Sequence, residues 1–182
     1  RARMRAGIGY VPQDRQRDGL VLPFTLTENM MLREAGGPFS RYGWLTKRSA
    51  KARTQALLDA FDVRPPRPDA QAGSLSGGNQ QKVILAREVA RRPKLLIAVQ
   101  PTRGLDVGAI EGIHRELLKL RDEGSAVLLV SLELEEIMAL ADRIIVMHAG
   151  QVMLEVPRDE AIIEEIGLAM TGERFTHTEV MT

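Results

Sequence analysis

The sequence of 182 residues contains no cysteine, so disulfide bonds play no part in its stability, a composition that fits a reducing compartment. Aromatic residues make up only 4% of the chain, and the core must therefore consist of aliphatic side chains. Neither sign of charge dominates, because 25 basic residues oppose 24 acidic ones and leave a formal net charge of +1. A chain of this kind has no general electrostatic attraction for nucleic acid or for an anionic membrane surface.

Targeting features are also missing. No apolar run approaches the length needed to cross a bilayer. The basic N-terminus, residues 1–5, is not followed by the apolar stretch of a signal peptide. Because the first residue is Arg1 and not methionine, we expect further residues to precede it in the parent polypeptide. Hydrophobic and charged fractions of 44% and 27% are those of an ordinary globular domain, with room for a small additional subdomain.

The first part of the chain is expected to be mainly helical. An apolar run over residues 7–11 predicts a buried strand, and the following residues, 13–19, predict a loop. A helical pattern that is interrupted at residues 36–38 ends in one amphipathic helix over residues 47–61. The prolines of residues 64–68 then predict a stiff, extended connector.

From residue 71 onward the pattern changes to alternating helices and strands. Turn residues and aliphatic runs predict helices over residues 79–91, 107–121, 133–141 and 160–170. They predict strands over residues 95–99, 127–130, 144–147 and 151–156, of which the last two form a hairpin. Strands separated by helices favour a parallel sheet, so the sequence predicts an α/β fold.

The most specific pattern is the octet LSGGNQQK at residues 75–82. A Ser-Gly-Gly turn at the start of a helix presents unpaired backbone N–H groups and the positive end of the helix dipole, where a phosphate can bind. Glycine leaves the backbone accessible because it has no Cβ, and the hydroxyl of Ser76 adds a further donor. For a bare Ser-Gly-Gly, an N-cap followed by a turn would be the ordinary explanation. The full octet and the motifs that follow it favour phosphate binding.

Several other segments occur in the same order as the motifs of one ATPase family. They are GYVPQDR at residues 9–15, the octet, LLIAVQPTRGLD at residues 95–106, and SLEL at residues 131–134 with ADRI at residues 141–144. Together they resemble the Q-loop, signature, Walker B strand with D-loop, and switch region of ABC ATPases. The octet and PTRGLDVGA at residues 101–109 more narrowly resemble the second, C-terminal cassette of the double-cassette subunits that drive simple-sugar and nucleoside importers.

The resemblance implies an α/β fold of the P-loop NTPase type, in which a RecA-like parallel sheet carries an ABC helical subdomain. The Walker A loop and the first strands of that fold have no counterpart in this sequence, which would begin just before the Q-loop. Four segments are expected: the Q-loop strand and loop at residues 1–18, the helical subdomain at 19–70, the RecA-like part at 71–172 and a polar tail at 173–182. One side of the sheet should then be uncovered, and we expect limited solubility or a non-native dimer that covers it.

Departures from the family pattern affect the hydrolytic chemistry. The sequence has no Gly-x-x-x-x-Gly-Lys-Ser/Thr loop to cradle the phosphates of ATP. Val99 and Gln100 stand in the places of the aspartate that orients Mg²⁺ and the glutamate that activates water, and neither can replace that residue. Leu132 stands in the place of the switch histidine, and we expect it to be a plain buried aliphatic. This chain alone should therefore bind ATP poorly and be inactive.

In the family, each ATP lies between the Walker A loop of one cassette and the signature of another. The resemblance implies that four signature residues bind ATP and Mg²⁺ held by a partner cassette: Ser76, Gly77, Gly78 and Gln80. Gln13 would approach the metal, though only in a complete cassette; the alternative is an ordinary surface glutamine. Asp106 would contact the opposing cassette or cap the following helix, and the two roles are compatible.

The partner cassette is expected to be the N-terminal half of the same polypeptide, and transmembrane permease subunits are expected to bind the helical subdomain. The protein would then be a peripheral subunit at the cytoplasmic face of the cell membrane. Two alternatives remain open: a non-catalytic, nucleotide-dependent scaffold, and a DNA-repair or chromosome-maintenance ATPase with the same signature. The short, cysteine-free segment between Q-loop and signature and the near-neutral charge disfavour the second, so no nucleic-acid partner is expected.

Overall fold

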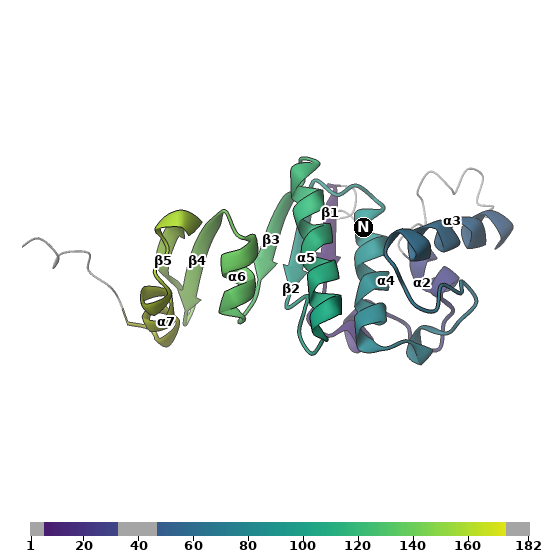
Figure 1. Cartoon of the computed structure of the whole chain (residues 1–182), viewed down its shortest axis with the longest axis horizontal. Helices are drawn as coiled ribbons and strands as arrows, with labels where there is room; N and C mark the ends of the chain where they lie inside the picture. Colours follow the sequence, from purple (N-terminus) through teal and green to yellow (C-terminus); the bar gives the residue numbers. More distant parts are fainter. Residues whose placement is uncertain (1–5, 33–46, 174–182) are drawn as a thin grey trace, which may run out of the picture. The chain divides into compact units, whose positions relative to one another are not determined.

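The computed structural model describes residues 6–32 and 47–173, and the chain divides into two compact units, Arg1–Val130 and Ser131–Thr182 (Figure 1). The interruption predicted at residues 36–38 lies outside the described residues, as does nearly all of the predicted tail. The boundary that the sequence predicts at residue 70, between a helical subdomain and an α/β part, falls inside the first unit.

The first unit is built on a three-stranded sheet in the order β1 (Ile8–Val11), β2 (Leu95–Val99), β3 (Ala126–Val130). Both pairs of neighbours are parallel. Parallel neighbours need a crossover connection, and α5 (Val107–Asp122) lies in the crossover from β2 to β3. The predicted α/β fold with a parallel sheet is thereby confirmed.

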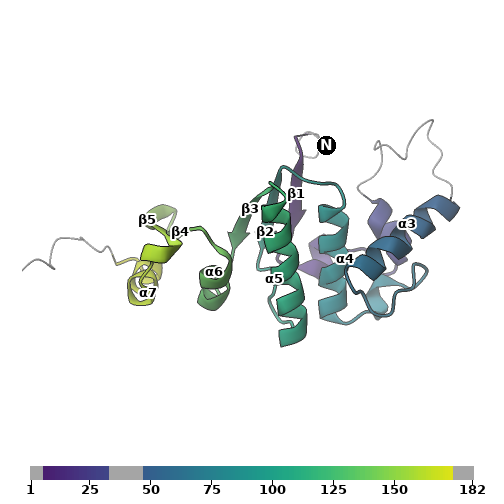
Figure 2. The same ribbon diagram turned by 45° about the horizontal axis from the view of Figure 1, so that its top comes forward.

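Helices cover one face of this sheet among the described residues. α4 (Gly77–Val89) packs against β1, and α5 packs against β3, on the same side of the strands in both views (Figures 1 and 2). Side chains alternate between the two faces along a strand. Leu96 is therefore buried beneath the helices, whereas Leu128 and Val130 on the other face are 50% and 46% exposed. Parallel sheets are normally covered on both faces, and the described helices of the first unit do not cover this one.

α4 is the central element of the first unit because it is enclosed by its neighbours. It contacts α2 (Leu26–Met31), α3 (Lys47–Ala60), α5 and β1. All six residues from 83 to 88 are buried. The helix predicted over residues 79–91 begins two positions earlier, at Gly77, since the preceding serine is its N-cap.

Two charged side chains are buried within α4, and both hold neighbouring elements. Arg87 Nε donates to Glu88 Oε1 at 3.1 Å, and Glu88 Oε2 accepts from the backbone N–H of Tyr10 in β1 at 3.3 Å. Arg87 also donates to the carbonyl oxygen of Asn29 in α2 at 3.4 Å. Since a buried charge is stable only when it is paired and hydrogen-bonded, this network joins α4 to the sheet and to the helical part.

The segment after β1 is more regular than the sequence predicts. In place of a loop over residues 13–19, Arg15–Gly19 form a short π-helix, η1. Its N-cap is Asp14, whose carboxylate accepts from the backbone N–H groups of Gln16 and Arg17, both at 3.0 Å. A turn of this length has no hydrophobic periodicity, so only the capping aspartate could have indicated it.

The helical part of the first unit consists of α2 and α3. α2 starts with a capping box: the Thr25 hydroxyl accepts from the N–H of Glu28 at 3.2 Å, and the Glu28 carboxylate accepts from the N–H of Thr25 at 2.8 Å. α3 matches the helix predicted over residues 47–61. The connector then runs to one 3-10 turn, η3 (Ala72–Ser74), before α4.

The second unit contains a hairpin and two helices. Its elements are α6 (Leu134–Leu140), β4 (Arg143–His148), β5 (Gln151–Pro157), the 3-10 turn η4 (Arg158–Glu160) and α7 (Ile163–Thr171). The hairpin is as predicted, and its two strands form an antiparallel sheet that is separate from the parallel sheet of the first unit. The two turn residues between the strands both have positive φ, which allows such local pairing. No helix in the described ranges is long and apolar enough to span a bilayer.

Replacing Asn29 by alanine should lower the free energy of unfolding by about 1–3 kcal/mol. The Asn29 side chain is fully buried; its Oδ1 accepts from the N–H of Val21 at 2.8 Å, and its Nδ2 donates to the carbonyl of Thr25 at 3.1 Å. Alanine leaves the partly buried N–H of Val21 without its acceptor. Equilibrium unfolding in urea measures the change.

Glu111→Ala provides the control, because Glu111 is exposed on α5. This substitution should change the free energy of unfolding by less than about 0.5 kcal/mol. If Asn29→Ala were as stable as the unsubstituted protein, the buried amide of Asn29 would not support the residues that precede α2.

Candidate functional site

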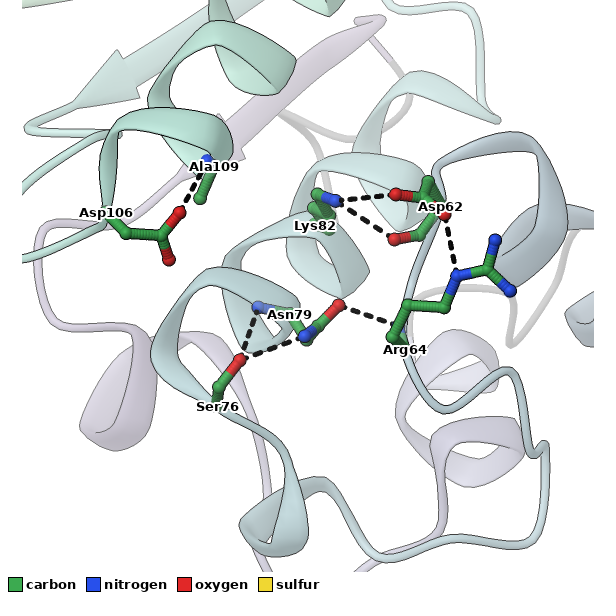
Figure 3. Close-up of polar contacts among 7 residues, drawn as sticks. All are labelled: Asp62, Arg64, Ser76, Asn79, Lys82, Asp106 and Ala109. Atoms are coloured by element: carbon green, nitrogen blue, oxygen red, sulfur yellow. Dashed lines mark hydrogen bonds and ion pairs between the residues drawn. The ribbon is translucent and has the colours of Figure 1, made fainter.

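The octet at residues 75–82 forms the start of α4, and Ser76 is the N-cap of this helix. The Ser76 hydroxyl accepts from the side-chain Nδ2 of Asn79 at 2.9 Å and from the backbone N–H of Asn79 at 3.5 Å (Figure 3). A hydroxyl can accept two hydrogen bonds and donate one, so the Ser76 proton stays available to an external acceptor. Because Ser76 is exposed, a ligand can reach it.

Two glycines form the first residues of α4. The N–H groups of Gly77 and Gly78 have no acceptor within the helix, because the first amides of an α-helix lack one. A Cβ at Gly78 would lie 2.9 Å from the Cβ of Ala109, and a Cβ at Gly77 would lie 2.5 Å from Nη2 of Arg15. Both distances are too short for a carbon atom. Packing against Ala109 therefore requires glycine at position 78, whereas a Cβ at position 77 would displace the end of the flexible Arg15 side chain.

Asn79 joins this turn to the connector that precedes it. Its Oδ1 accepts from the backbone N–H of Arg64 at 2.7 Å, while its Nδ2 donates to Ser76 (Figure 3). One end of the Asn79 amide is thus fixed by the connector, and the other end orients the serine hydroxyl. This role is missed when the sequence is read alone, although a polar residue three positions after an N-cap serine is the spacing of a capping box.

An ion-pair cluster holds the same connector against α4. Lys82 Nζ donates to the backbone carbonyl of Asp62 at 3.0 Å and to its carboxylate at 3.3 Å, and Arg64 Nε donates to the same carboxylate at 2.8 Å (Figure 3). The hydrogen bond and charge of Lys82, followed by those of Arg64, hold the pKa of the Asp62 carboxyl below its ordinary value of 3.8. The residues after α3 are therefore attached to α4 at two points.

Gln80 lies inside the protein. Its side chain is 2% exposed, its Nε2 donates to the carbonyl of Ala72 at 3.1 Å, and its Oε1 accepts from Nε2 of Gln16 at 3.2 Å. Both ends of the amide are engaged within the chain, so the side chain holds the residues around the turn together. The direct contact with a nucleotide that the resemblance implies for Gln80 stays a prediction.

Asp106 begins the neighbouring helix and lies beside the glycine turn. Its Oδ1 accepts from the backbone N–H of Ala109 at 2.9 Å and makes it the N-cap of α5 (Figure 3). Its Oδ2 lies 3.6 Å from where a Cβ of Gly78 would be. The predicted capping role is confirmed, and the contact with an opposing cassette stays a prediction.

Gln13 lies two residues after the end of β1 and is exposed. Its amide oxygen is accessible to a ligand, and its predicted role near a metal stays a prediction. Two residues further on, Arg15 Nη1 donates to the backbone carbonyl of Arg103 at 3.0 Å. This hydrogen bond, which the sequence does not signal, joins the segment after β1 to the loop after β2.

The residues at the end of β2 cannot perform the chemistry of hydrolysis. Val99 is partly buried and ends the strand, while Gln100 is 8% exposed and has a left-handed backbone with φ of 50°. Its backbone N–H donates to the carbonyl of Val130 at 2.7 Å. Left-handed residues other than glycine cost energy and cluster at functional sites. The assignment of Val99 and Gln100 to the hydrolytic positions stays a prediction.

The structure contradicts the prediction that Leu132 is buried, because its side chain is 71% exposed. Leu132 lies in the second unit, in the short link before α6. Such a link has no hydrophobic periodicity that would direct a side chain inward, so the aliphatic character of Leu132 does not indicate burial. Its assignment to the switch position stays a prediction.

The described residues fit an anion better than a metal ion. The hydroxyl of Ser76 and the amides of Gly77 and Gly78 are all donors, which suit the oxygens of a phosphate. Within residues 6–32 and 47–173, no group of three His, Cys, Asp or Glu could hold a metal ion. Gln13 offers one oxygen and Val99 none, so Mg²⁺ would need ligands from the nucleotide and from other residues.

Comparisons with known proteins agree with these features. A family model described as ABC transporter matches residues 1–103. The nucleoside import ATP-binding protein NupA of Lactococcus lactis subsp. cremoris is 50% identical over 166 residues, which are 91% of this chain and 33% of that protein. The guanosine import ATP-binding protein NupO of Bacillus subtilis is 50% identical over 168 residues, 92% of this chain and 33% of that protein. The chain thus spans about a third of these relatives.

The ribose import ATP-binding protein RbsA of Streptococcus agalactiae serotype Ia is 39% identical over 169 residues, 93% of this chain and 34% of that protein. Among solved structures, the dimeric post-hydrolysis state of the ATP-binding cassette MJ0796 bound to ADP and Pi has a TM-score of 0.71 and 28% identity. That match covers 86% of this chain and 66% of the other. The fold is therefore that of an ATP-binding cassette, of which the chain represents a part.

Asp62→Asn should lower stability at neutral pH, and its difference from the unsubstituted protein should shrink as the pH falls below 3.8. The pKa of Asp62 is lower in the folded protein than in the unfolded chain, so its carboxylate contributes stability above the unfolded value. That contribution is lost as the pH falls through the folded pKa. Unfolding midpoints of both proteins between pH 7 and pH 3 measure the effect.

Gln71→Ala changes an exposed side chain that carries no ionisable group, and it is the control. Its difference from the unsubstituted protein should stay constant over the same pH range. A constant difference for Asp62→Asn as well would show that Lys82 and Arg64 do not stabilise the charged carboxylate.

Proposed function

Because this chain belongs to the ABC transporter family, we propose that it is part of the ATP-binding subunit of an importer for nucleosides or simple sugars. The printed names of the relatives, nucleoside, guanosine and ribose import proteins, support this solute class over a scaffold or a DNA-repair ATPase. Since the chain spans about a third of their length, the activity belongs to a larger polypeptide that contains it.

The chain would contribute the signature to an ATP site that a second cassette completes. The observation that carries this proposal is the start of α4, where the exposed Ser76 hydroxyl precedes the amides of Gly77 and Gly78, which as first-turn amides have no acceptor within the helix. These donors would bind the terminal phosphate and stabilise the negative charge that develops on it during hydrolysis. Asn79 and the buried Gln80 would hold the turn in its binding geometry. ATP with Mg²⁺ would supply the phosphoanhydride bond that is broken.

The hydrolytic positions of this chain would serve nucleotide binding without turnover. Val99 cannot coordinate Mg²⁺, and Gln100 can hold a water molecule but cannot take its proton. Leu132 has no imidazole to offer the terminal phosphate, and Gln13 would approach the metal in the complete cassette. We infer that hydrolysis takes place at one of two composite sites, the one to which Ser76 belongs.

The partner cassette would be the N-terminal half of the same polypeptide, and transmembrane permease subunits would bind the helical part around α2 and α3. The exposed sheet face with Leu128 and Val130 supports the requirement for further polypeptide, because a parallel sheet is normally covered on both faces. The subunit would be peripheral, at the cytoplasmic face of the membrane, and would bind no nucleic acid.

In the full polypeptide assembled with its permease, Ser76→Arg should reduce steady-state ATP turnover about 100-fold. The substitution removes the hydroxyl donor and places a long side chain where the phosphate would bind. Because Ser76 is exposed, the larger side chain does not disturb the core. Release of inorganic phosphate at saturating MgATP measures the change.

Glu123→Arg introduces the same side chain at another exposed position, the C-cap of α5, and is the control. It should leave turnover within about twofold of the unsubstituted protein, as expected for an exposed position. Turnover that is unaffected by Ser76→Arg would rule out a role of this turn in the composite site.

Gln100→Glu should not restore hydrolysis at the site that lacks acidic residues, because Val99 and Leu132 remain unable to hold Mg²⁺ or the terminal phosphate. The measurement is best made in the Ser76→Arg background, where the residual turnover reports this second site. A rise of less than about twofold is expected, whereas a working general base would contribute about 100-fold or more. A rise of the larger size would show that the metal and switch positions are competent.

A further inference from the structure

We propose that Arg15 is a positioning residue of the ATP site, and that its guanidinium holds both the Ser76–Gly78 turn and the loop after β2 in place. The inference rests on the proposed function, because the position of the turn matters to activity only if the turn binds nucleotide. It goes beyond that function in assigning a role to a residue outside the signature and outside the hydrolytic positions.

Arg15 touches two loops that are distant from it in sequence. Its Nη1 donates to the backbone carbonyl of Arg103 at 3.0 Å. Its Nη2 lies 2.5 Å from where a Cβ of Gly77 would be, so the guanidinium is packed directly against the first residue of α4. Since the guanidinium is planar and rigid, these two contacts together determine its orientation. Arg15 is partly buried, which limits the screening of its interactions by solvent.

The neighbouring residue makes a second connection between the same segments. Gln16 Nε2 donates to Oε1 of Gln80 at 3.2 Å, and Gln80 Nε2 donates in turn to the carbonyl of Ala72 on the other side of the turn. Two consecutive residues of η1 therefore hold the start of α4. A displacement of η1 would disturb the turn at both points.

A side chain at position 77 would displace Arg15. A methyl group there would overlap Nη2 of Arg15, and the guanidinium, as the end of a flexible side chain, would move away from it. We expect that movement to break the hydrogen bond to the carbonyl of Arg103. The present orientation of Arg15 thus depends on glycine at position 77.

Arg15 lies between segments that would belong to two different nucleotide sites. Gln13, two residues before Arg15, would belong to the nucleotide site of this cassette, whereas the turn at Ser76 would bind the nucleotide of the partner. The loop after β2 ends at Asp106, the N-cap of α5 beside Gly78. Arg15 therefore connects the three segments through which one cassette would meet both nucleotides.

A double-mutant cycle in the full polypeptide with its permease tests the proposal. Arg15→Ala and Gly77→Ala should each lower kcat for ATP hydrolysis about tenfold, as expected for loss of a hydrogen bond from a charged donor. The double variant should also be about tenfold lower and not about 100-fold, because both changes remove the same contact. A 100-fold loss in the double variant would show that the two residues act independently and would overturn the proposal.

Two further variants separate positioning from packing. Arg15→Lys keeps a charged donor that can reach the Arg103 carbonyl and should recover kcat to within about threefold of the unsubstituted protein, whereas Arg15→Met keeps only the apolar stem and should remain about tenfold low. Equal activity of the lysine and methionine variants would mean that Arg15 only fills space, and would overturn the proposal. Unfolding in urea, measured in parallel, should show both variants folded.

Matched controls are available within the same elements. Arg17→Ala removes an exposed arginine of η1, and Gly112→Ala adds a methyl in α5 at an ordinary 3.7 Å from Lys82 Cε; both should stay within about twofold. If Ser76→Arg left turnover unchanged, the proposed function itself would fail. If Ser76→Arg abolished turnover while Arg15→Ala stayed within twofold, only the role of Arg15 would be wrong.

Discussion

The enclosure of α4 by its neighbours is the constraint on which the candidate site depends. Five elements pack around this helix: α2, α3, α5, β1 and η1. Its two buried charged residues, Arg87 and Glu88, are hydrogen-bonded to α2 and β1. A helix packed in this way cannot shift without opening a cavity or leaving a buried charge without its partner, and both cost free energy. Its first turn, with Ser76 at the surface, is therefore presented in a defined position.

Side chains that hold the turn come from segments far apart in the sequence. Asn79 bonds the connector after α3, Gln80 bonds η1 and the residues before α4, and Arg15 reaches the loop after β2. Each of these bonds involves a polar group that is oriented by another group in the protein. The turn is in this sense preorganised, and a ligand would not have to order it on binding, which is a requirement for effective electrostatic stabilisation.

The residues that would hold a nucleotide and those that would hydrolyse it differ in the chemical groups they offer in this chain. The donors at the start of α4 are intact, whereas Val99, Gln100 and Leu132 lack the acid, base and imidazole functions of a hydrolytic site. Gln100 has a left-handed backbone, and its N–H donates to the carbonyl of Val130 in β3; neither feature needs a carboxylate side chain. Under the proposed function, this cassette would complete the site of a partner without turnover of its own.

Features with local signals could be predicted from the sequence: the α/β class, most helices and strands within a few residues, the hairpin, the caps at Ser76 and Asp106, and the octet that points to phosphate. Other features became known only from the folded chain: the burial of Gln80, the exposure of Leu132, the separate sheet of β4 and β5, and the contact of Arg15 with Gly77 and Arg103. Caps and periodicity depend on residues a few positions apart, which the sequence displays directly. Burial and long-range hydrogen bonds depend on which elements meet, and that is settled only when the whole chain packs.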